Sequence, residues 1–184
     1  MTSSVRIPLI QATKPNEIWA MDFMHDVLCH GRRFKVLTVV DVYTKGCKVL
    51  KADTSINGIS VTNELKRLKE YDEMPEFIII DNGPEFSGKV LDEWAYRNSI
   101  QMHFIRPGKP TENRYIESFK GKFRDECLNE HRFNNLEEAR KIIETWRLDY
   151  NENRPHSALN GLTPNEFMKF LINLKAEKTC FTNF

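Results

Sequence analysis

The sequence has no cysteine pair at the spacing of a zinc site or a redox motif. Its four cysteines are Cys29, Cys47, Cys127 and Cys180, and no two of them form a C-x-x-C pair. The five histidines add no zinc-ligand pattern to them. We therefore expect no structural zinc and predict free thiols in a reducing cytoplasm.

The sequence also lacks an apolar stretch of membrane-spanning length and an N-terminal signal of charged and then apolar residues. It contains no internal repeats and no low-complexity tracts. The net charge is only +1, so the chain as a whole lacks the excess of basic residues that marks many nucleic-acid-binding proteins. Its 184 residues, 40% hydrophobic and 29% charged, fit one soluble domain with a single core and no membrane partner.

Basic residues are concentrated in one part of the chain, between positions 106 and 124. Only two acidic residues, Glu112 and Glu117, lie in this segment. A local excess of positive charge is typical of a surface that follows a phosphate backbone. The basic residues are Arg106, Lys109, Arg114, Lys120, Lys122 and Arg124.

Three acidic residues have surroundings typical of metal ligands. Asp22 lies in an apolar segment, and Asp81 directly follows the apolar run of residues 77–80. Glu117 lies in a predicted helix, with 35 residues between it and Asp81. Three carboxylates on separate elements can hold two divalent cations for in-line displacement at a phosphodiester. Hard oxygen ligands favour Mg²⁺ or Mn²⁺.

The two aspartates also have simpler interpretations. Asp22 alternates with Met24 and Asp26, so it could lie on the solvated face of a strand. Asp81 precedes Asn82-Gly83 and could be an Asx-turn residue. Against this, the carboxyl end of a buried strand is where ligands collect in open α/β sheets.

Glu117 shares a helix face with Arg114, Lys120 and Arg124. In isolation this pattern is most simply a set of solvated salt pairs. Asn113, one turn earlier, could contact DNA or brace the carboxylate. Residues 106–111 contain two prolines and a glycine and are predicted to form a loop.

The apolar periodicity predicts three strands, a helix, a strand, a helix, a strand and then further helices. Ser87 is the predicted N-cap of the second helix, and Asn135 begins a capping-box pattern. A short helix is predicted to begin at Thr163-Pro164. The predicted strands are 18–28, 34–44, 46–53, 77–80 and 100–104, and the helices are 60–71, 87–95, 116–127, 136–150 and one from 164.

Several motifs resemble the catalytic core of integrases and bacterial insertion-sequence transposases, above all the IS-three family. The resemblance covers roughly residues 6–170. It is based on motifs that occur in the family order. These are Trp19-Ala20-Met21-Asp22, DNGPEF from Asp81, FIRPGKPT from Phe104, IESF from Ile116, FRDECLNE from Phe123 and the segment from Tyr150 through Arg154-Pro155-His156 to Leu162-Thr163-Pro164.

The resemblance implies an α/β chain with a ribonuclease H-like fold, in which a five-stranded mixed central sheet is flanked by helices. We expect an N-terminal arm or linker at 1–16, the integrase-like core at 17–170 and a C-terminal tail at 171–184. Members of the family carry helix-turn-helix segments before the core, and residues 1–16 are too few for one. We therefore expect a core that lacks specific recognition of element ends.

The resemblance further implies a polynucleotidyl transferase that cuts and joins DNA strands. Asp22, Asp81 and Glu117 would be its catalytic residues and would hold two Mg²⁺ or Mn²⁺ ions. The expected partners are double-stranded DNA, from transposon ends and target, and further copies of the chain in a homodimer or larger multimer. The predicted DNA contacts are Lys109, Asn113, Arg114, Lys120 and Arg124.

We expect no small-molecule substrate, and a location in the bacterial cytoplasm, at the nucleoid when DNA is bound. Two other functions stay open at this point. One is a ribonuclease H-like nuclease that only hydrolyses DNA, and the other is an idle remnant that binds DNA or dimerises. The intact triad argues against the remnant, and the motifs outside the triad favour the transferase over the nuclease.

Overall fold

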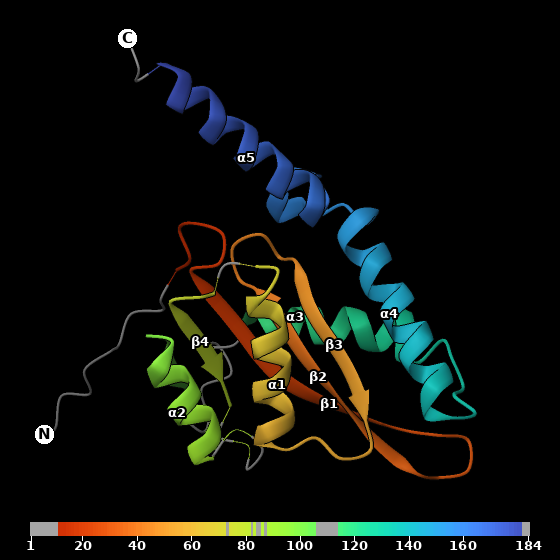
Figure 1. Cartoon of the computed structure of the whole chain (residues 1–184). Helices are drawn as coiled ribbons and strands as arrows, with labels where there is room; N and C mark the ends of the chain where they lie inside the picture. The colour runs from red at the N-terminus through yellow and green to blue at the C-terminus, as the bar shows by residue number, and fades with distance from the viewer. Residues whose placement is uncertain are drawn as a thin grey trace, which may run out of the picture.

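A five-stranded mixed sheet forms the centre of the molecule, with strand order β3-β2-β1-β4-β5 (Figure 1). The computed structural model describes residues 11–72, 74–81, 83, 86, 88–105 and 114–181. β1 pairs antiparallel with β2 and parallel with β4. The strands are β1 (Ile18–Val27), β2 (Arg33–Asp41), β3 (Cys47–Asp53), β4 (Phe77–Ile80) and β5 (Gln101–Phe104). The predicted fold and all five predicted strands are confirmed.

Helices cover both faces of the sheet. In Figure 1, α1 and α2 lie in front of it, α3 lies behind it, α4 runs beside β3, and α5 extends away from the body. The helices are α1 (Gly58–Lys69), α2 (Lys89–Arg97), α3 (Arg114–Phe123), α4 (Leu136–Glu152) and α5 (Pro164–Phe181). α3 continues into a π-helical turn, η2 (Arg124–Leu128), and a 3₁₀ turn, η3 (Ser157–Leu159), precedes α5.

Alternation along β1 divides its side chains between two cores. Trp19 and Met21 pack in the cluster under α1 and α2. Met24 faces the other side, in a cluster with Phe119 and Phe123 of α3. Ile116, Phe119, Phe123 and Cys127 are all buried, as their helical spacing predicts. Asp22 lies on the same side as Met24, so α3 covers it.

Three sequence predictions need correction in detail. The N-cap of α2 is Gly88 and makes no side-chain capping bond, so the prediction of Ser87 is wrong. α5 begins at the predicted Pro164 but has 18 residues, so it is not short. The wholly apolar run at 77–80 predicts a strand buried on both faces, but only Ile78 and Ile80 are fully buried. Phe77 and Ile79 are partly buried, because a smaller cluster covers that face.

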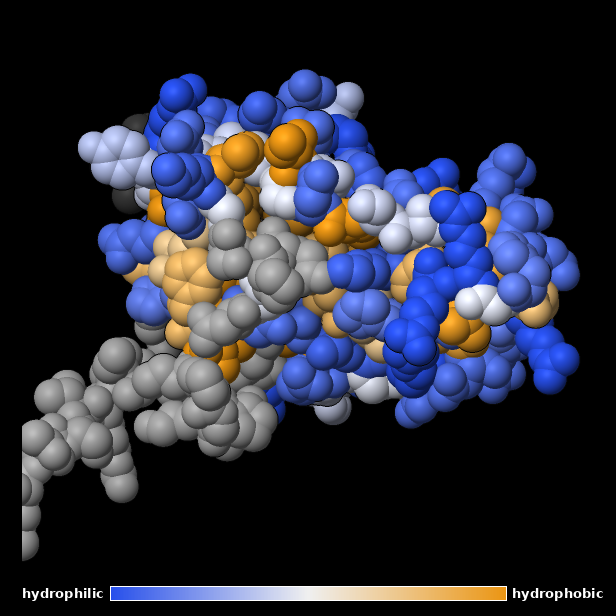
Figure 2. Space-filling model, turned by 90° about the horizontal axis from the view of Figure 1, so that it is seen from below, coloured by the Kyte–Doolittle hydropathy of each residue, from blue (hydrophilic) through white to orange (hydrophobic). Residues whose placement is uncertain are grey.

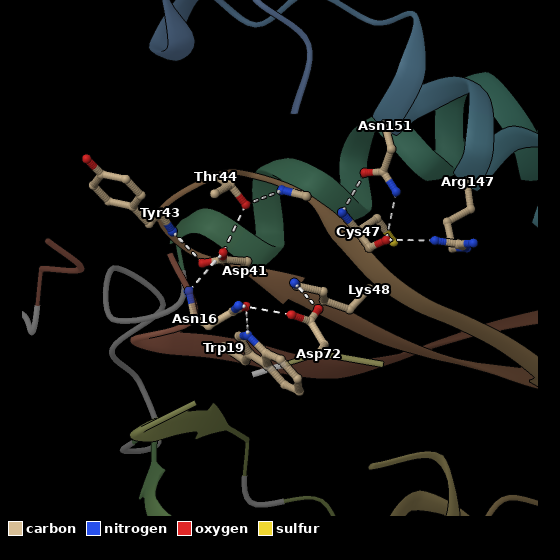
Figure 3. Close-up of polar contacts among 11 residues, drawn as sticks. Asn16, Trp19, Asp41, Tyr43, Thr44, Cys47, Lys48, Asp72, Arg147 and Asn151 are labelled. Atoms are coloured by element: carbon tan, nitrogen blue, oxygen red, sulfur yellow. Dashed lines mark hydrogen bonds and ion pairs between the residues drawn. The ribbon is translucent and has the colours of Figure 1, made fainter. Parts of the chain in front are cut away.

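α4 closes the exposed edge of the sheet at β3 with polar side chains. Asn151 accepts a hydrogen bond from the Cys47 amide at 2.8 Å and donates one to the Cys47 carbonyl at 2.9 Å (Figure 3). Arg147 donates to the same carbonyl, and Arg140 donates to the carbonyl of Ala52. These bonds satisfy backbone groups that an edge strand otherwise exposes for aggregation.

Seen from below the view of Figure 1, the coloured surface is mostly hydrophilic, and apolar side chains appear in several separate places among the hydrophilic ones (Figure 2). Within the described ranges, no helix is both long enough and apolar enough to cross a membrane.

Candidate active site

The parallel pairing of β1 and β4 brings the two predicted aspartates to neighbouring positions. The last paired residues are Met21 on β1 and Ile80 on β4. Asp22 directly follows Met21 in β1, and Asp81 directly follows Ile80 at the carboxyl end of β4. Neighbouring strands in a sheet lie about 4.8 Å apart, which is a suitable spacing for two carboxylates that share a ligand.

Asp22 is buried, with only 5% of its surface exposed. Its Oδ1 accepts a hydrogen bond from the Phe23 amide at 2.7 Å, and its Oδ2 accepts one from the Lys120 ammonium at 2.7 Å. The solvated-face interpretation of Asp22 is therefore wrong, because α3 packs over this side of β1. A buried carboxylate is costly unless it is paired, and Lys120 supplies the pairing.

Asp81 is half-buried and forms the turn that its sequence context predicts. Its Oδ1 accepts a hydrogen bond from the Gly83 amide at 3.0 Å, which is an Asx-turn. This bond orients the carboxylate through Oδ1. The described residues donate no hydrogen bond to Oδ2. An Asx-turn and a ligand role are therefore compatible at this position.

Glu117 is tied to Asp22 through a single lysine. The Glu117 side chain is 53% exposed, and its Oε1 lies 3.3 Å from Nζ of Lys120. Burial alone would lower the pKa of Lys120. The hydrogen bond and charge of Asp22, together with the charge of Glu117, outweigh this and raise the pKa. Lys120 therefore stays charged and joins two of the three predicted carboxylates.

The donor set fits a hard divalent cation, although the side chains do not converge on one point. Among the described residues, no three His, Cys, Asp or Glu side chains are grouped closely enough to hold a metal ion. Carboxylates repel one another unless positive charge lies between them, and here the Lys120 ammonium supplies that charge for Asp22 and Glu117. Asp81 adjoins them through the β1–β4 register.

Comparison with known proteins places this geometry in a family. The integrase core domain profile matches residues 12–110, and a second integrase core domain profile matches residues 98–164. The chain belongs to the integrase core domain family. It is 53% identical over 153 residues to an uncharacterized 31.7 kDa protein of insertion element IS407 from Burkholderia multivorans, covering 83% of this chain and 55% of that protein.

A second relative is an uncharacterized 39.2 kDa protein of insertion element IS476 from Xanthomonas euvesicatoria. It is 43% identical over 88% of this chain and 47% of its own length. The chain thus spans about half the length of the curated relatives it matches. The HTLV-2 integrase catalytic core domain, solved in complex with magnesium in a dimeric form, has a TM-score of 0.58 at 19% identity, covering 84% of this chain and 96% of that one. This likeness confirms the ribonuclease H-like fold.

The residues that are predicted to contact DNA differ from one another in their surroundings. Arg114 is exposed at the start of α3 and makes no ion pair within the described part of the chain. Lys120 and Arg124 instead turn toward β1. Lys109 and Asn113, like the predicted loop at 106–111, lie outside the described residues.

A second ion pair lies beside the carboxylates and was not identified from the sequence. Arg124 lies 3.5 Å from Asp26 and donates a 2.8 Å hydrogen bond to the carbonyl of His25. The sequence alone indicates no partner for Asp26. Sequence spacing gives no signal for this pair, because the four residues from Asp22 to Asp26 span about 13 Å on a strand, whereas four residues span about 6 Å on a helix.

His156 lies in the Arg154-Pro155-His156 motif and could, from the sequence alone, contact phosphate or support the C-terminal segment. It is buried, packs edge-on against the Tyr150 ring at 5.0 Å, and its backbone binds Leu162 and Gly161. Burial and the nearby positive charges lower the pKa of His156 to about 4, so it is neutral at pH 7. These contacts favour the supporting role.

The thiols that the structure describes are free, as predicted. Cys29, Cys47 and Cys127 form no disulfide, while the side chain of Cys180 lies outside the described residues. Burial raises the pKa of Cys47 and raises that of Cys127 to about 12. Neither thiol is therefore reactive at neutral pH.

Proposed function

We propose that this chain is the catalytic core of an insertion-sequence transposase, a polynucleotidyl transferase that cuts DNA strands and joins them to a target. The observation that carries the proposal is that three carboxylates lie on adjoining elements. Asp22 and Asp81 are neighbours across β1 and β4, and Glu117 is linked to Asp22 through Lys120.

Each carboxylate has a role that follows from its position. The buried Asp22 and the turn-anchored Asp81 provide fixed oxygens, while the exposed Glu117 can move to complete the ligand set. Magnesium or manganese held by these three residues would activate the attacking hydroxyl and stabilise the leaving oxygen in an in-line displacement. No covalent intermediate between the protein and DNA is needed.

The proposed substrate is double-stranded DNA, first the element ends and then the target. Arg114 is exposed at the start of the helix that carries Glu117 and is a proposed phosphate contact, as are Lys109 and Asn113 in the preceding segment. The relatives belong to insertion elements, and the HTLV-2 core was solved with magnesium as a dimer, which supports a metal-dependent multimer. The proposal places the chain in the bacterial cytoplasm, where that DNA lies.

A disintegration assay tests the proposal with the fewest demands on specific end recognition. The substrate is a branched oligonucleotide that mimics the strand-transfer product, incubated with Mn²⁺. The wild type should form joined product and Glu117→Gln should not. Glu137→Gln is the matched control, because that carboxylate is exposed on α4 and binds only Lys141 there. Cleavage without joining would favour a nuclease, and equal product from wild type and Glu117→Gln would contradict the proposal.

A further inference from the structure

One side chain, Lys120, occupies the place between two of the proposed ligands. Its ammonium lies 2.7 Å from Oδ2 of Asp22 and 3.3 Å from Oε1 of Glu117. The lysine reaches from α3 to β1, and its side chain is only 21% exposed. Lys120 thus sets the distance between the carboxylates of Asp22 on β1 and Glu117 on α3. No backbone pairing between the strand and the helix fixes this distance.

Lys120 is not what attaches α3 to the sheet. Ile116, Phe119 and Phe123 anchor the helix by burial in the apolar clusters. Four residues after Lys120, Arg124 makes a second polar attachment, to the backbone carbonyl of His25. Loss of the Lys120 ammonium therefore leaves the helix packed, and the lysine is free to serve another purpose.

A divalent cation and the Lys120 ammonium compete for the same carboxylate oxygen. Two positive charges held within a few ångströms of each other repel strongly in a half-buried site. The lysine has a flexible four-carbon stem and a compact charge, so it can swing into solvent without moving the helix. Asp22 is held by the sheet and cannot follow it.

We propose that Lys120 is a positioning residue that holds Asp22 and Glu117 together before the metal binds and withdraws when a divalent cation takes its place. This inference rests on the proposed function, since it assigns a step to the same metal site. It also explains how a buried aspartate and an exposed glutamate are kept close without the metal. Lys120 is thereby assigned to the carboxylates first, and its ammonium becomes available to a DNA phosphate only after displacement.

Metal affinity tests the proposal without relying on catalysis. Mn²⁺ binding is measured by electron paramagnetic resonance of the free ion for wild type, Lys120→Met and Lys122→Met. Lys120→Met should bind Mn²⁺ about tenfold more tightly, because no charge-assisted bond has to be broken. Lys122→Met is the matched control, because this half-buried lysine of the same helix makes no ion pair with the described acidic residues. Its affinity should stay within about twofold of wild type.

A spectroscopic measurement on the otherwise unaltered protein gives a second readout. Lysines are reductively methylated with ¹³C, which keeps their charge, and Lys120→Met identifies the Lys120 signal by its absence. Titration with Mg²⁺ should shift that signal saturably, and Asp22→Asn should abolish the shift. A Lys120 signal that does not respond at saturating Mg²⁺ would overturn the inference.

The outcomes separate this inference from the proposed function. Mn²⁺ binding that Lys120→Met leaves unchanged or weakens would overturn the inference alone, since the metal site would stand and the lysine would not compete for it. Mn²⁺ binding that is absent from the wild type, or equal in wild type and Asp22→Asn, would overturn the proposed metal site and the inference with it.

Discussion

Two neighbouring strands each carry a buried aspartate, and the surroundings of these residues differ. Asp41 on β2 is completely buried and accepts hydrogen bonds from the Tyr43 amide, the Thr44 hydroxyl and the Asn16 amide at 2.9, 2.9 and 3.2 Å (Figure 3). Asp22 on β1 accepts one backbone bond, and its other oxygen binds a lysine. Neutral groups fixed in a turn satisfy the first carboxylate, whereas a movable cation satisfies the second.

The difference separates an aspartate that holds the fold from one that is available for chemistry. Two of the donors around Asp41 belong to the β2–β3 turn, and the third is the backbone of Asn16 in the turn that precedes β1, so the carboxylate joins these two turns. The lysine on Asp22 can leave without unfolding anything. Burial alone therefore does not identify a functional carboxylate, and the kind of partner is the better criterion.

Replacement of Asp22 by asparagine should give the largest effect. The variant loses the charge that holds the metal, so joined product in the disintegration assay should fall roughly a thousandfold, equivalent to several kcal/mol of lost transition-state stabilisation. Its unfolding midpoint should change little, because one hydrogen bond from Phe23 persists. Activity within tenfold of wild type would show that Asp22 is not needed for strand joining.

Replacement of Asp41 by asparagine should give the opposite pattern. Its carboxylate faces three donors, and an amide nitrogen in place of one oxygen leaves a donor facing donors. We expect a loss of about 2 kcal/mol in the free energy of unfolding, measured by urea titration, with activity per folded molecule kept. If Asp41→Asn abolished joining while leaving stability unchanged, the assignment of a structural role to Asp41 would be wrong.

An effect confined to acidic pH is expected from His156. Its ring packs against Tyr150, whose hydroxyl binds the carbonyl of Lys45. The pKa of His156 is lowered from 6.5 to about 4 by burial and by neighbouring cations. Between these values the unfolded chain binds a proton that the folded chain does not, so stability falls as the pH drops from about 6.5 toward 4.

This contribution amounts to roughly 3 kcal/mol over that interval. It is measured by urea titrations at several pH values on wild type and His156→Gln. The slope of stability against pH should be shallower for the variant, whatever its stability at pH 7. Parallel slopes would show that His156 is protonated alike in both states.

Features that depend on a single element could be predicted from the sequence. The apolar run at 77–80 predicts β4 with both ends correct, and Asp81 forms the Asx-turn that Asn82-Gly83 predicts. Asn135 caps α4 by accepting a hydrogen bond from the Glu138 amide at 2.9 Å, as its capping-box pattern predicts. These features depend on neighbouring residues, whose preferences are readable from the chain.

Contacts between side chains that are distant in the sequence could not be predicted. Lys120 and Asp22 are 98 positions apart, and Asn151 and Cys47 are 104 apart, so neither contact follows from local pattern. Lys120 was predicted to contact DNA because basic residues are concentrated between positions 106 and 124, and that contact stays a prediction. Its reach to β1 depends on how α3 lies over the sheet, which periodicity does not specify. The π-helical turn η2 was also not predicted, because its apolar spacing matches an ordinary helix.

The central claim is that Asp22, Asp81 and Glu117 form one metal site, and a crystal soaked in MnCl₂ tests it most directly. An anomalous difference map collected at the manganese edge should contain a peak within ligand distance of both Asp22 and Asp81, with the Lys120 ammonium moved away from Asp22. A peak located elsewhere, or no peak beside a Lys120 that still binds Asp22 at saturating Mn²⁺, would contradict the account.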